Sequence, residues 1–161
     1  PDAAHAAGRA AEVVEAHPDE RPDTLLRRCH EELRSTRGAA ITIAAIDETG
    51  SEMTWAGVGN VQAALLQARP AAGGAREWVP LRGGVVGYLL PSLRTATVRL
   101  EHDDVLVFAT DGVRPVFGDW PGPGEPPQNV AARILDEQGR GTDDALVLVA
   151  RYRGGLAAKA E

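Results

Sequence analysis

The pattern of apolar and polar positions predicts two helices at the start of the chain. Asp2–His17 is rich in alanine, and Pro18 ends this helix because proline lacks a backbone N–H and clashes with the preceding turn. A cap at Asp23 or Thr24 is expected to begin a second helix that runs to about Thr36. The apolar residues of this second helix recur at helical spacing: Leu25, Leu26, Cys29 and Leu33.

A run of short strands is predicted after these helices. Ala39–Asp47 carries branched residues in short alternation, which is typical of a buried strand. The chain returns through Met53–Val58 after a hairpin loop, and a Gly59-Asn60 turn leads into Val61–Arg69. Three consecutive antiparallel strands are therefore expected. Two further strands are predicted at Glu77–Leu81 and Arg94–Leu100. The glycine-rich segment between them, Arg82–Leu90, receives no assignment.

The last two strands are the most apolar segments of the chain. Val105–Thr110 and Ala145–Tyr152 carry apolar residues on both faces, which predicts that both lie in the centre of a sheet covered on each side. Between them, a proline- and glycine-rich loop over Pro115–Pro127 precedes a helix over Asn129–Gln138. Grouped strands with segregated helices favour an α+β fold over a doubly wound parallel sheet.

Length and composition indicate one domain with an acidic surface. The chain has 161 residues, with 17 Lys and Arg against 23 Asp and Glu, and a formal net charge of −6. A single domain over residues 1–153 with a flexible tail at 154–161 is expected. The negative charge argues against a nucleic-acid-binding or membrane-binding surface, because such partners need a basic field. The sequence shows neither a membrane span nor a signal-peptide pattern, so a cytoplasmic location is expected.

Aspartates stand at the ends of the two most apolar strands. Asp111 follows the first strand in a Thr-Asp-Gly step, and Asp143 and Asp144 immediately precede the second. If these strands pair in an antiparallel manner, the aspartates lie about 5 Å apart across the sheet. Grouped carboxylates repel one another, and a bound cation such as Mg²⁺ or Mn²⁺ relieves that repulsion. Each motif by itself is also an ordinary turn signal, so a metal site and a pair of turns are both open interpretations.

Several segments resemble, in order and spacing, the metal-dependent protein phosphatase (PPM, protein phosphatase 2C-like) superfamily. Within it, the set is most similar to the bacterial SpoIIE and RsbX branch, and the resemblance covers about Pro1–Tyr152. The Gly59-Asn60 turn and Gly84–Gly87 with Pro91 are most similar to RsbX-type phosphatases. Each motif is weak alone, whereas the ordered set is fairly specific. The segments are RGAAIT from Arg37, Ile46-Asp47 with Gly50, WAGVGNV from Trp55, VLVFATDGV from Val105 and DDALVLV from Asp143.

The resemblance implies an antiparallel β-sandwich flanked by helices, with a two-metal Mn²⁺ or Mg²⁺ centre. By motif position, Asp111 and Asp143 resemble the family's metal ligands, and Asp144 either supports the site or is only solvated. The implied reaction is hydrolysis of phosphoserine or phosphothreonine on a protein. Its nucleophile is a water molecule that the metal activates, so no side chain is expected to attack phosphorus.

One feature of the family is missing from the sequence. The family carries an early strand that ends in an Asp-Gly-x-Gly-His-Gly-like segment, whose aspartate bridges both metals, and no such segment occurs here. The chain begins at Pro1, where the helix after that segment is expected, so the N-terminal strands of the sandwich are expected to be missing. Asp2 lies inside a predicted helix and Asp47 at a hairpin, so neither replaces the bridging ligand. The chain is then either a truncated portion of a phosphatase or a protein that works without catalysis.

These observations lead to one main functional hypothesis and two rivals. The main hypothesis is a bacterial phosphatase domain that acts on a phosphorylated regulatory protein of the partner-switching or stressosome kind, a substrate class that the resemblance implies. The alternative is a catalytically inactive phosphatase-like module that binds a regulatory protein. In the third interpretation, the chain is an unrelated α+β interaction domain in which Asp111 and Asp143 only make turns. The sequence leaves the oligomeric state open.

Overall fold

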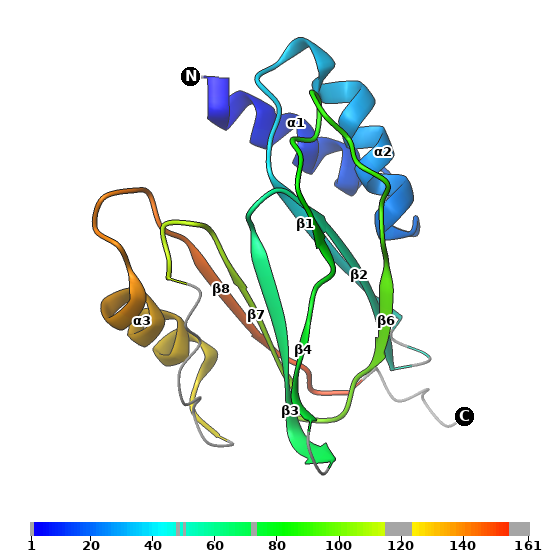
Figure 1. Cartoon of the computed structure of the whole chain (residues 1–161). Coiled ribbons are helices and arrows are strands. Elements are labelled where there is room, and N and C mark those ends of the chain that lie inside the picture. The colour runs from blue at the N-terminus through cyan, green and yellow to red at the C-terminus, as the bar shows by residue number, and fades with distance from the viewer. Residues whose placement is uncertain (1, 48, 50, 72–73, 115–123, 155–161) are drawn as a thin grey trace. The chain divides into compact units, whose positions relative to one another are not determined.

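The structure is a computed structural model that describes residues 2–47, 49, 51–71, 74–114 and 124–154. Over this part, the chain forms two compact units, each containing a four-stranded sheet (Figure 1). The chain passes between the units several times, so each unit is assembled from separate stretches of sequence. Unit 1 comprises Pro1–Ile46, Met53–Val61 and Val79–Val98, and unit 2 comprises Asp47–Glu52, Gln62–Trp78 and Arg99–Glu161.

The sheet of unit 1 is organised around its second strand. β1 (Ile41–Asp47) lies next to β2 (Glu52–Val58), and β5 (Leu81–Arg82) pairs with β2 in parallel. β6 (Ala96–Arg99) also pairs with β2. Because β2 has three strand partners, most of its residues are buried, and Trp55 is fully buried as a core residue.

Two helices supply much of the core of unit 1. α1 (Asp2–Ala16) packs against α2 (Pro22–Glu32), which continues into the 3₁₀ turn η1 (Leu33–Ser35). The predicted apolar positions of the second helix are all buried, and burial raises the pKa of the Cys29 thiol. The buried core cluster of this unit comprises Ala6, Ala10, Leu25, Leu26, Cys29, Leu33, Ile43, Ala56, Val58 and Val86.

The predicted start of the second helix is wrong. α2 begins at Pro22, whose missing N–H costs nothing in the first helical turn. Arg21 occupies the cap position without a side-chain hydrogen bond. Asp23 lies in the first turn, where its negative charge is favourable at the positive end of the helix dipole. Neither Asp23 nor Thr24 therefore caps the helix.

The glycine-rich segment that received no assignment from the sequence is an ordered part of unit 1. Val86 and Ala39 exchange two backbone hydrogen bonds of 2.9 Å. Gly87 donates its N–H to Nδ1 of His30 at 2.9 Å. His30 thus anchors this segment to α2.

Unit 2 contains an antiparallel sheet in the order β4-β3-β7-β8. Its strands are β3 (Gln62–Ala71), β4 (Gly74–Trp78), β7 (Val105–Ala109) and β8 (Val147–Arg151). α3 (Pro127–Gln138) packs against β8, which confirms the predicted late helix. The buried core cluster of this unit comprises Leu66, Val105, Val107, Ala109, Val113, Val130 and Ile134.

The predicted meander of three consecutive strands is wrong. β3 does not pair with β2, because it lies between β4 and β7 in the sheet of unit 2. Gly59, at a φ of 101°, donates its N–H to the carbonyl of Arg82 at 2.9 Å instead of closing a hairpin. With three strand partners already on β2, the chain leaves this sheet at Gly59-Asn60 and enters the other.

Two further strand predictions need correction. The predicted strand Glu77–Leu81 is divided between β4 and β5, with Pro80 between them, because proline cannot donate to a strand ladder. Among the described strands, β8 lies at the edge of its sheet and not at the centre. Its residues alternate, because Val149 packs on the core of unit 2 whereas Leu148 is 50% exposed.

Some predictions fall on residues that are not described. The predicted loop over Pro115–Pro127 lies outside the described residues up to position 123, and the predicted tail lies outside them from position 155. In the described part of the chain, no helix combines the length and apolar character that crossing a membrane requires.

A buried carboxylate holds the start of β7 in place. Asp104 is 1% exposed, and its Oδ1 and Oδ2 accept the backbone N–H groups of Ala68 and Glu101, both at 2.8 Å. The carbonyl of Asp104 accepts the N–H of Tyr152 at 2.8 Å. This one residue therefore joins β3, the turn before β7 and the residue that follows β8.

We expect Asp104→Ala to lower the free energy of unfolding by about 3 kcal/mol, because two N–H groups lose the charged acceptor that they have in the fold. Urea denaturation followed by circular dichroism measures this change. Asp136→Ala, at an exposed position of α3 in the same unit, serves as the control and should change the stability little. Equal stability of the two variants would contradict the structural role given to Asp104.

Candidate metal centre

The pairing of β7 with β8 brings the predicted site aspartates to one end of a sheet. The two strands are antiparallel, with Val105 opposite Arg151 and Ala109 opposite Val147. The pairing continues beyond the strands, because Thr110 donates its N–H to the carbonyl of Leu146 at 3.1 Å. Leu146 in turn donates its N–H to Oγ1 of Thr110 at 2.9 Å. The loops that carry the aspartates therefore begin side by side.

Contact between the two loops is closest at Gly112. A Cβ atom built on Gly112 would overlap the carbonyl oxygen of Asp144 and lie 2.8 Å from its carbonyl carbon. The same Cβ atom would lie 3.0 Å from Cα of Ala145. The backbone of the Asp111-Gly112 step thus packs directly on the backbone of Asp144, an approach that only glycine permits.

The end of α3 fixes the other side of this turn. Arg140 donates its N–H to the carbonyl of Gly112 at 2.8 Å, and Arg114 donates its N–H to the carbonyl of Gln138 at 2.9 Å. Within the turn, the N–H of Val113 bonds to the carbonyl of Thr110 at 3.0 Å. The loop after β7 is therefore positioned by hydrogen bonds to the end of a helix as well as to the segment before β8.

The structure places all three predicted ligands at this end of unit 2, and all three are exposed. Asp143 accepts the N–H of Asp144 at 2.9 Å through its Oδ1, which holds the Asp143 side chain against its own loop. Carboxylate oxygens are the ligands that Mg²⁺ and Mn²⁺ prefer, and open solvent leaves room for the water molecules that Mg²⁺ keeps. The donor type and the placement of Asp111 and Asp143 therefore fit a divalent cation.

The number of donors is smaller than a complete metal site needs. Among the residues that the structure describes, no group of three or more His, Cys, Asp and Glu side chains is arranged to hold a metal ion. Asp47 does not add to the site, because its Oδ1 accepts the N–H and the hydroxyl of Thr49, at 2.9 and 2.7 Å. This confirms Asp47 as a hairpin residue. Among the described residues, Asp111 and Asp143 therefore form only an incomplete candidate for a cation site.

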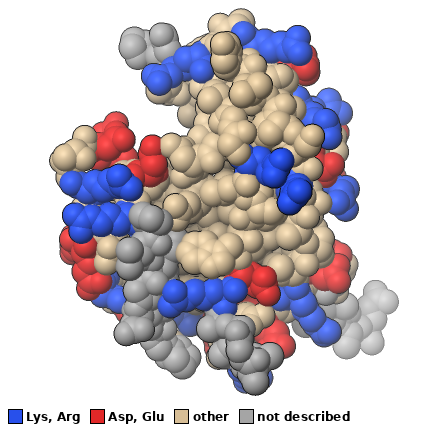
Figure 2. All heavy atoms as spheres, viewed as in Figure 1, with Lys and Arg blue, Asp and Glu red and all other residues tan. Residues whose placement is uncertain are grey.

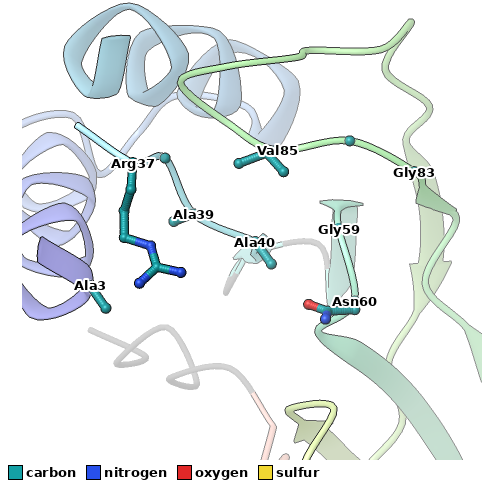
Figure 3. Close-up of a pocket in the computed structure, with 10 residues that line it drawn as sticks. Ala3, Arg37, Ala39, Ala40, Gly59, Asn60, Gly83 and Val85 are labelled. Atoms are coloured by element: carbon teal, nitrogen blue, oxygen red, sulfur yellow. The ribbon is translucent and has the colours of Figure 1, made fainter. Parts of the chain in front are cut away.

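Unit 1 contains a pocket that the sequence analysis missed. Its volume is about 640 Å³, and Arg37 and Asn60 are among the residues that line it (Figure 3). In the sequence, the pocket is marked only by four glycines in three separate segments. None of these segments has the strand–loop–helix order of a phosphate-binding loop. Only the fold brings them together: Gly38, Gly59, Gly83 and Gly84.

We expect Gly112→Ala to lower the free energy of unfolding by about 2 kcal/mol, because the added methyl group forces the two aspartate loops apart. Gly8→Ala is the matched control. A Cβ atom at Gly8 meets no atom within 4 Å, and the residue lies in α1, so this variant should gain about 1 kcal/mol from helix propensity. Urea denaturation measures both, and a gain in stability for Gly112→Ala would show that the loops are not in contact.

Comparison with known proteins places this geometry in a family. The family model of stage II sporulation protein E (SpoIIE) matches residues 1–153. A solved structure described under the bacterial stressosome, a modular system adapted to control secondary messenger signalling, is 26% identical with a TM-score of 0.76. That match covers 94% of this chain and 78% of the other. None of the curated proteins matches the chain.

Two further solved structures show the same fold at lower identity. RsbX in complex with magnesium is 19% identical with a TM-score of 0.78, and the match covers 91% of this chain and 72% of the other. The serine/threonine phosphatase PstP/Ppp of Mycobacterium tuberculosis is 13% identical with a TM-score of 0.65, over 92% and 81% of the two chains. The α+β fold predicted from the sequence is therefore confirmed as the fold of PPM phosphatases. The family model matches nearly the whole length of the chain. The chain therefore belongs to the SpoIIE family, in the SpoIIE and RsbX branch of the PPM phosphatase superfamily.

Proposed function

We propose that the chain is a metal-dependent protein phosphatase domain that uses Mn²⁺ or Mg²⁺ to hydrolyse phosphoserine or phosphothreonine on a bacterial cytoplasmic regulatory protein. The observation that carries this proposal is the joint placement of Asp111 and Asp143 at one end of the β7–β8 pair. Membership of the SpoIIE family supports the phosphatase class. Similarity to a structure described under the bacterial stressosome supports a substrate of the partner-switching or stressosome kind.

In this proposal, Asp111 and Asp143 hold the cation through their carboxylate oxygens. When bound, Mn²⁺ or Mg²⁺ would supply Lewis-acid stabilisation of phosphoryl oxygens and would lower the pKa of a water molecule available as the nucleophile. The chain contributes position: the Gly112 contact and the Thr110 hydrogen bonds fix the two loops before any ligand binds. Preorganised ligands reduce the cost of binding, because little ordering is left to be done. We propose that Asp144 supports Asp143 from the adjoining position.

A specific observation favours a second candidate function. The described residues contain no group of three or more metal-binding side chains, so the cation site within them is incomplete. A chain with such a site would bind a phosphorylated regulatory protein without hydrolysing it. This second candidate function is that of a phosphatase-like binding module. Unlike the first, it involves no hydrolysis of the phosphorylated protein.

A manganese titration tests the cation site directly. We expect saturating Mn²⁺, at about 100 times its dissociation constant, to stabilise the chain by about 2.7 kcal/mol, since the ion binds only the folded state. For a chain of this size the melting temperature should rise by roughly 5–10 °C. Asp111→Asn should lose most of this rise, because a neutral amide is a weaker ligand of similar shape. Asp136→Asn, an exposed position of α3, should retain it.

Hydrolysis of an aryl phosphate with Mn²⁺ then separates the two functions. The phosphatase proposal predicts turnover that depends on Mn²⁺ and is lost in Asp111→Asn. The binding-module alternative predicts stabilisation by Mn²⁺ without turnover. If Mn²⁺ stabilises neither the chain nor the Asp136→Asn control, the assignment of Asp111 and Asp143 as ligands is wrong.

A further inference from the structure

Thr110, the last residue before Asp111, lies at the point where the pairing of β7 with β8 gives way to a turn. Continuing the register of the two strands places Thr110 opposite Leu146. In a regular antiparallel ladder, a hydrogen-bonded pair of this kind exchanges two backbone bonds from N–H to carbonyl. One of these bonds is present, because Thr110 donates its N–H to the carbonyl of Leu146 at 3.1 Å. The carbonyl of Thr110 instead accepts the N–H of Val113 at 3.0 Å and closes the turn that carries Asp111.

The hydroxyl group of Thr110 takes the place of this carbonyl in the ladder. Leu146 donates its N–H to Oγ1 of Thr110 at 2.9 Å. The main chain can therefore turn at Asp111 while it stays bonded to the segment before β8. Such a replacement needs a hydroxyl group on Cβ, which serine and threonine provide. Valine has nearly the same shape as threonine, but it has no acceptor at that position.

This arrangement fixes the backbone of Asp111 on both sides. On one side, the hydroxyl group of Thr110 holds the N–H of Leu146. On the other side, Gly112 packs on the backbone of Asp144. Both contacts are made with the segment that precedes β8. The backbone of Asp111 therefore cannot move away from that segment unless one of the two contacts breaks.

Divalent cations differ in how strictly they require such fixed positions. Mg²⁺ demands a near-ideal octahedron of oxygens at about 2.0–2.1 Å, whereas Ca²⁺ accepts about six to eight oxygens at about 2.3–2.6 Å in a flexible arrangement. Carboxylates that are held at fixed positions can therefore favour the smaller ion. Carboxylates on loosely connected loops adapt to Ca²⁺ at little cost, so they lose that preference.

Charge alone does not select between these cations. The formal net charge of −6 attracts every divalent cation to the chain. On the face drawn in Figure 2, acidic side chains are interspersed with basic ones and do not gather in one patch. Neither the net charge nor this surface distinguishes Mg²⁺ from Ca²⁺, since the two ions carry the same charge. Selection between them therefore has to come from the positions of the ligands.

We infer that the Thr110 hydroxyl is a positioning group that makes the site of Asp111 and Asp143 select Mg²⁺ over Ca²⁺. This inference rests on the proposed function, because that function assigns Asp111 and Asp143 to a divalent cation. In this role the hydroxyl acts through the position of Asp111 and is not itself a ligand. Replacing a group that orients metal ligands from outside typically lowers metal affinity by about 10- to 100-fold.

An NMR titration of the ¹⁵N-labelled chain with MgCl₂ or CaCl₂ tests the inference. Both cations are diamagnetic, so the amide signals of Gly112 and Leu146 stay visible and report binding. The wild-type chain should bind Mg²⁺ more tightly than Ca²⁺. Thr110→Val should weaken Mg²⁺ binding by about 10-fold and change Ca²⁺ binding little, because Ca²⁺ tolerates displaced ligands. Thr110→Ser keeps the hydroxyl group and should retain the preference for Mg²⁺.

Two further measurements separate positioning from general stability. The N–H of Leu146 should exchange with solvent faster in Thr110→Val than in the wild-type chain or in Thr110→Ser, because its acceptor has been removed. Thr36→Val is the matched control, since the hydroxyl group of Thr36 accepts the N–H of Gly38 at 3.0 Å in unit 1. This variant loses a hydrogen bond of the same kind and should keep both cation affinities.

Several results would refute the inference and leave the proposed function standing. These are equal affinities of the wild-type chain for the two cations, an unchanged ratio of the two affinities in Thr110→Val, and unchanged exchange of the Leu146 N–H in that variant. A loss of the Mg²⁺ preference in Thr110→Ser or Thr36→Val would also refute it, because the hydroxyl group at position 110 would then not be the cause.

Two remaining outcomes are also decided by measurement. If the wild-type chain does not bind Mg²⁺, the inference is refuted, and the manganese titration decides separately whether the proposed function fails with it. If Thr110→Val does not fold, Thr110→Ala takes its place. That variant removes the hydroxyl group without adding volume, and the same loss of Mg²⁺ preference is expected.

Discussion

The antiparallel register between β7 and β8 is the constraint on which the candidate metal centre depends. Asp111 and Asp143 are far apart in the sequence, and only this register brings their loops to the same end of the sheet. A shift of one residue would turn the face of β8 that carries Val149 away from its core cluster. The apolar packing of β8 therefore fixes the position of the aspartates.

The sequence was informative wherever a local period or a long apolar run determines the structure. The alanine-rich first helix, the helix containing Cys29 and the apolar strand that precedes Asp111 all appear where the pattern predicts them. The candidate site could also be predicted, because aspartates at opposite ends of two apolar strands converge if those strands pair. The same reasoning overestimated the burial of β8. Its apolar run indicated a central strand, whereas Leu148 is half-exposed on an edge strand.

Features that depend on contacts between distant segments were not predictable. No local pattern shows that the chain changes sheets after Gly59, because two of the three partners of β2, β5 and β6, come from later in the sequence. Asp104 stands directly before an apolar strand in the sequence, and its burial is evident only from the approach of Ala68 in the fold. The pocket that contains Arg37 has the same origin, since its glycines are brought together from separate segments. In each case the residue has no distinctive local sequence pattern, and its role follows from contacts with residues that are distant in the sequence.

Electrostatics decides how the proposed metal centre could attract a phosphorylated substrate. A chain with a formal net charge of −6 repels a phosphate monoester at long range, so each place that receives the ester needs a local positive charge. At Asp111 and Asp143 the side chains are negative, and only a bound cation can make that place attractive to phosphate. In the proposed phosphatase, the candidate metal centre therefore depends on a divalent cation for its attraction to phosphate.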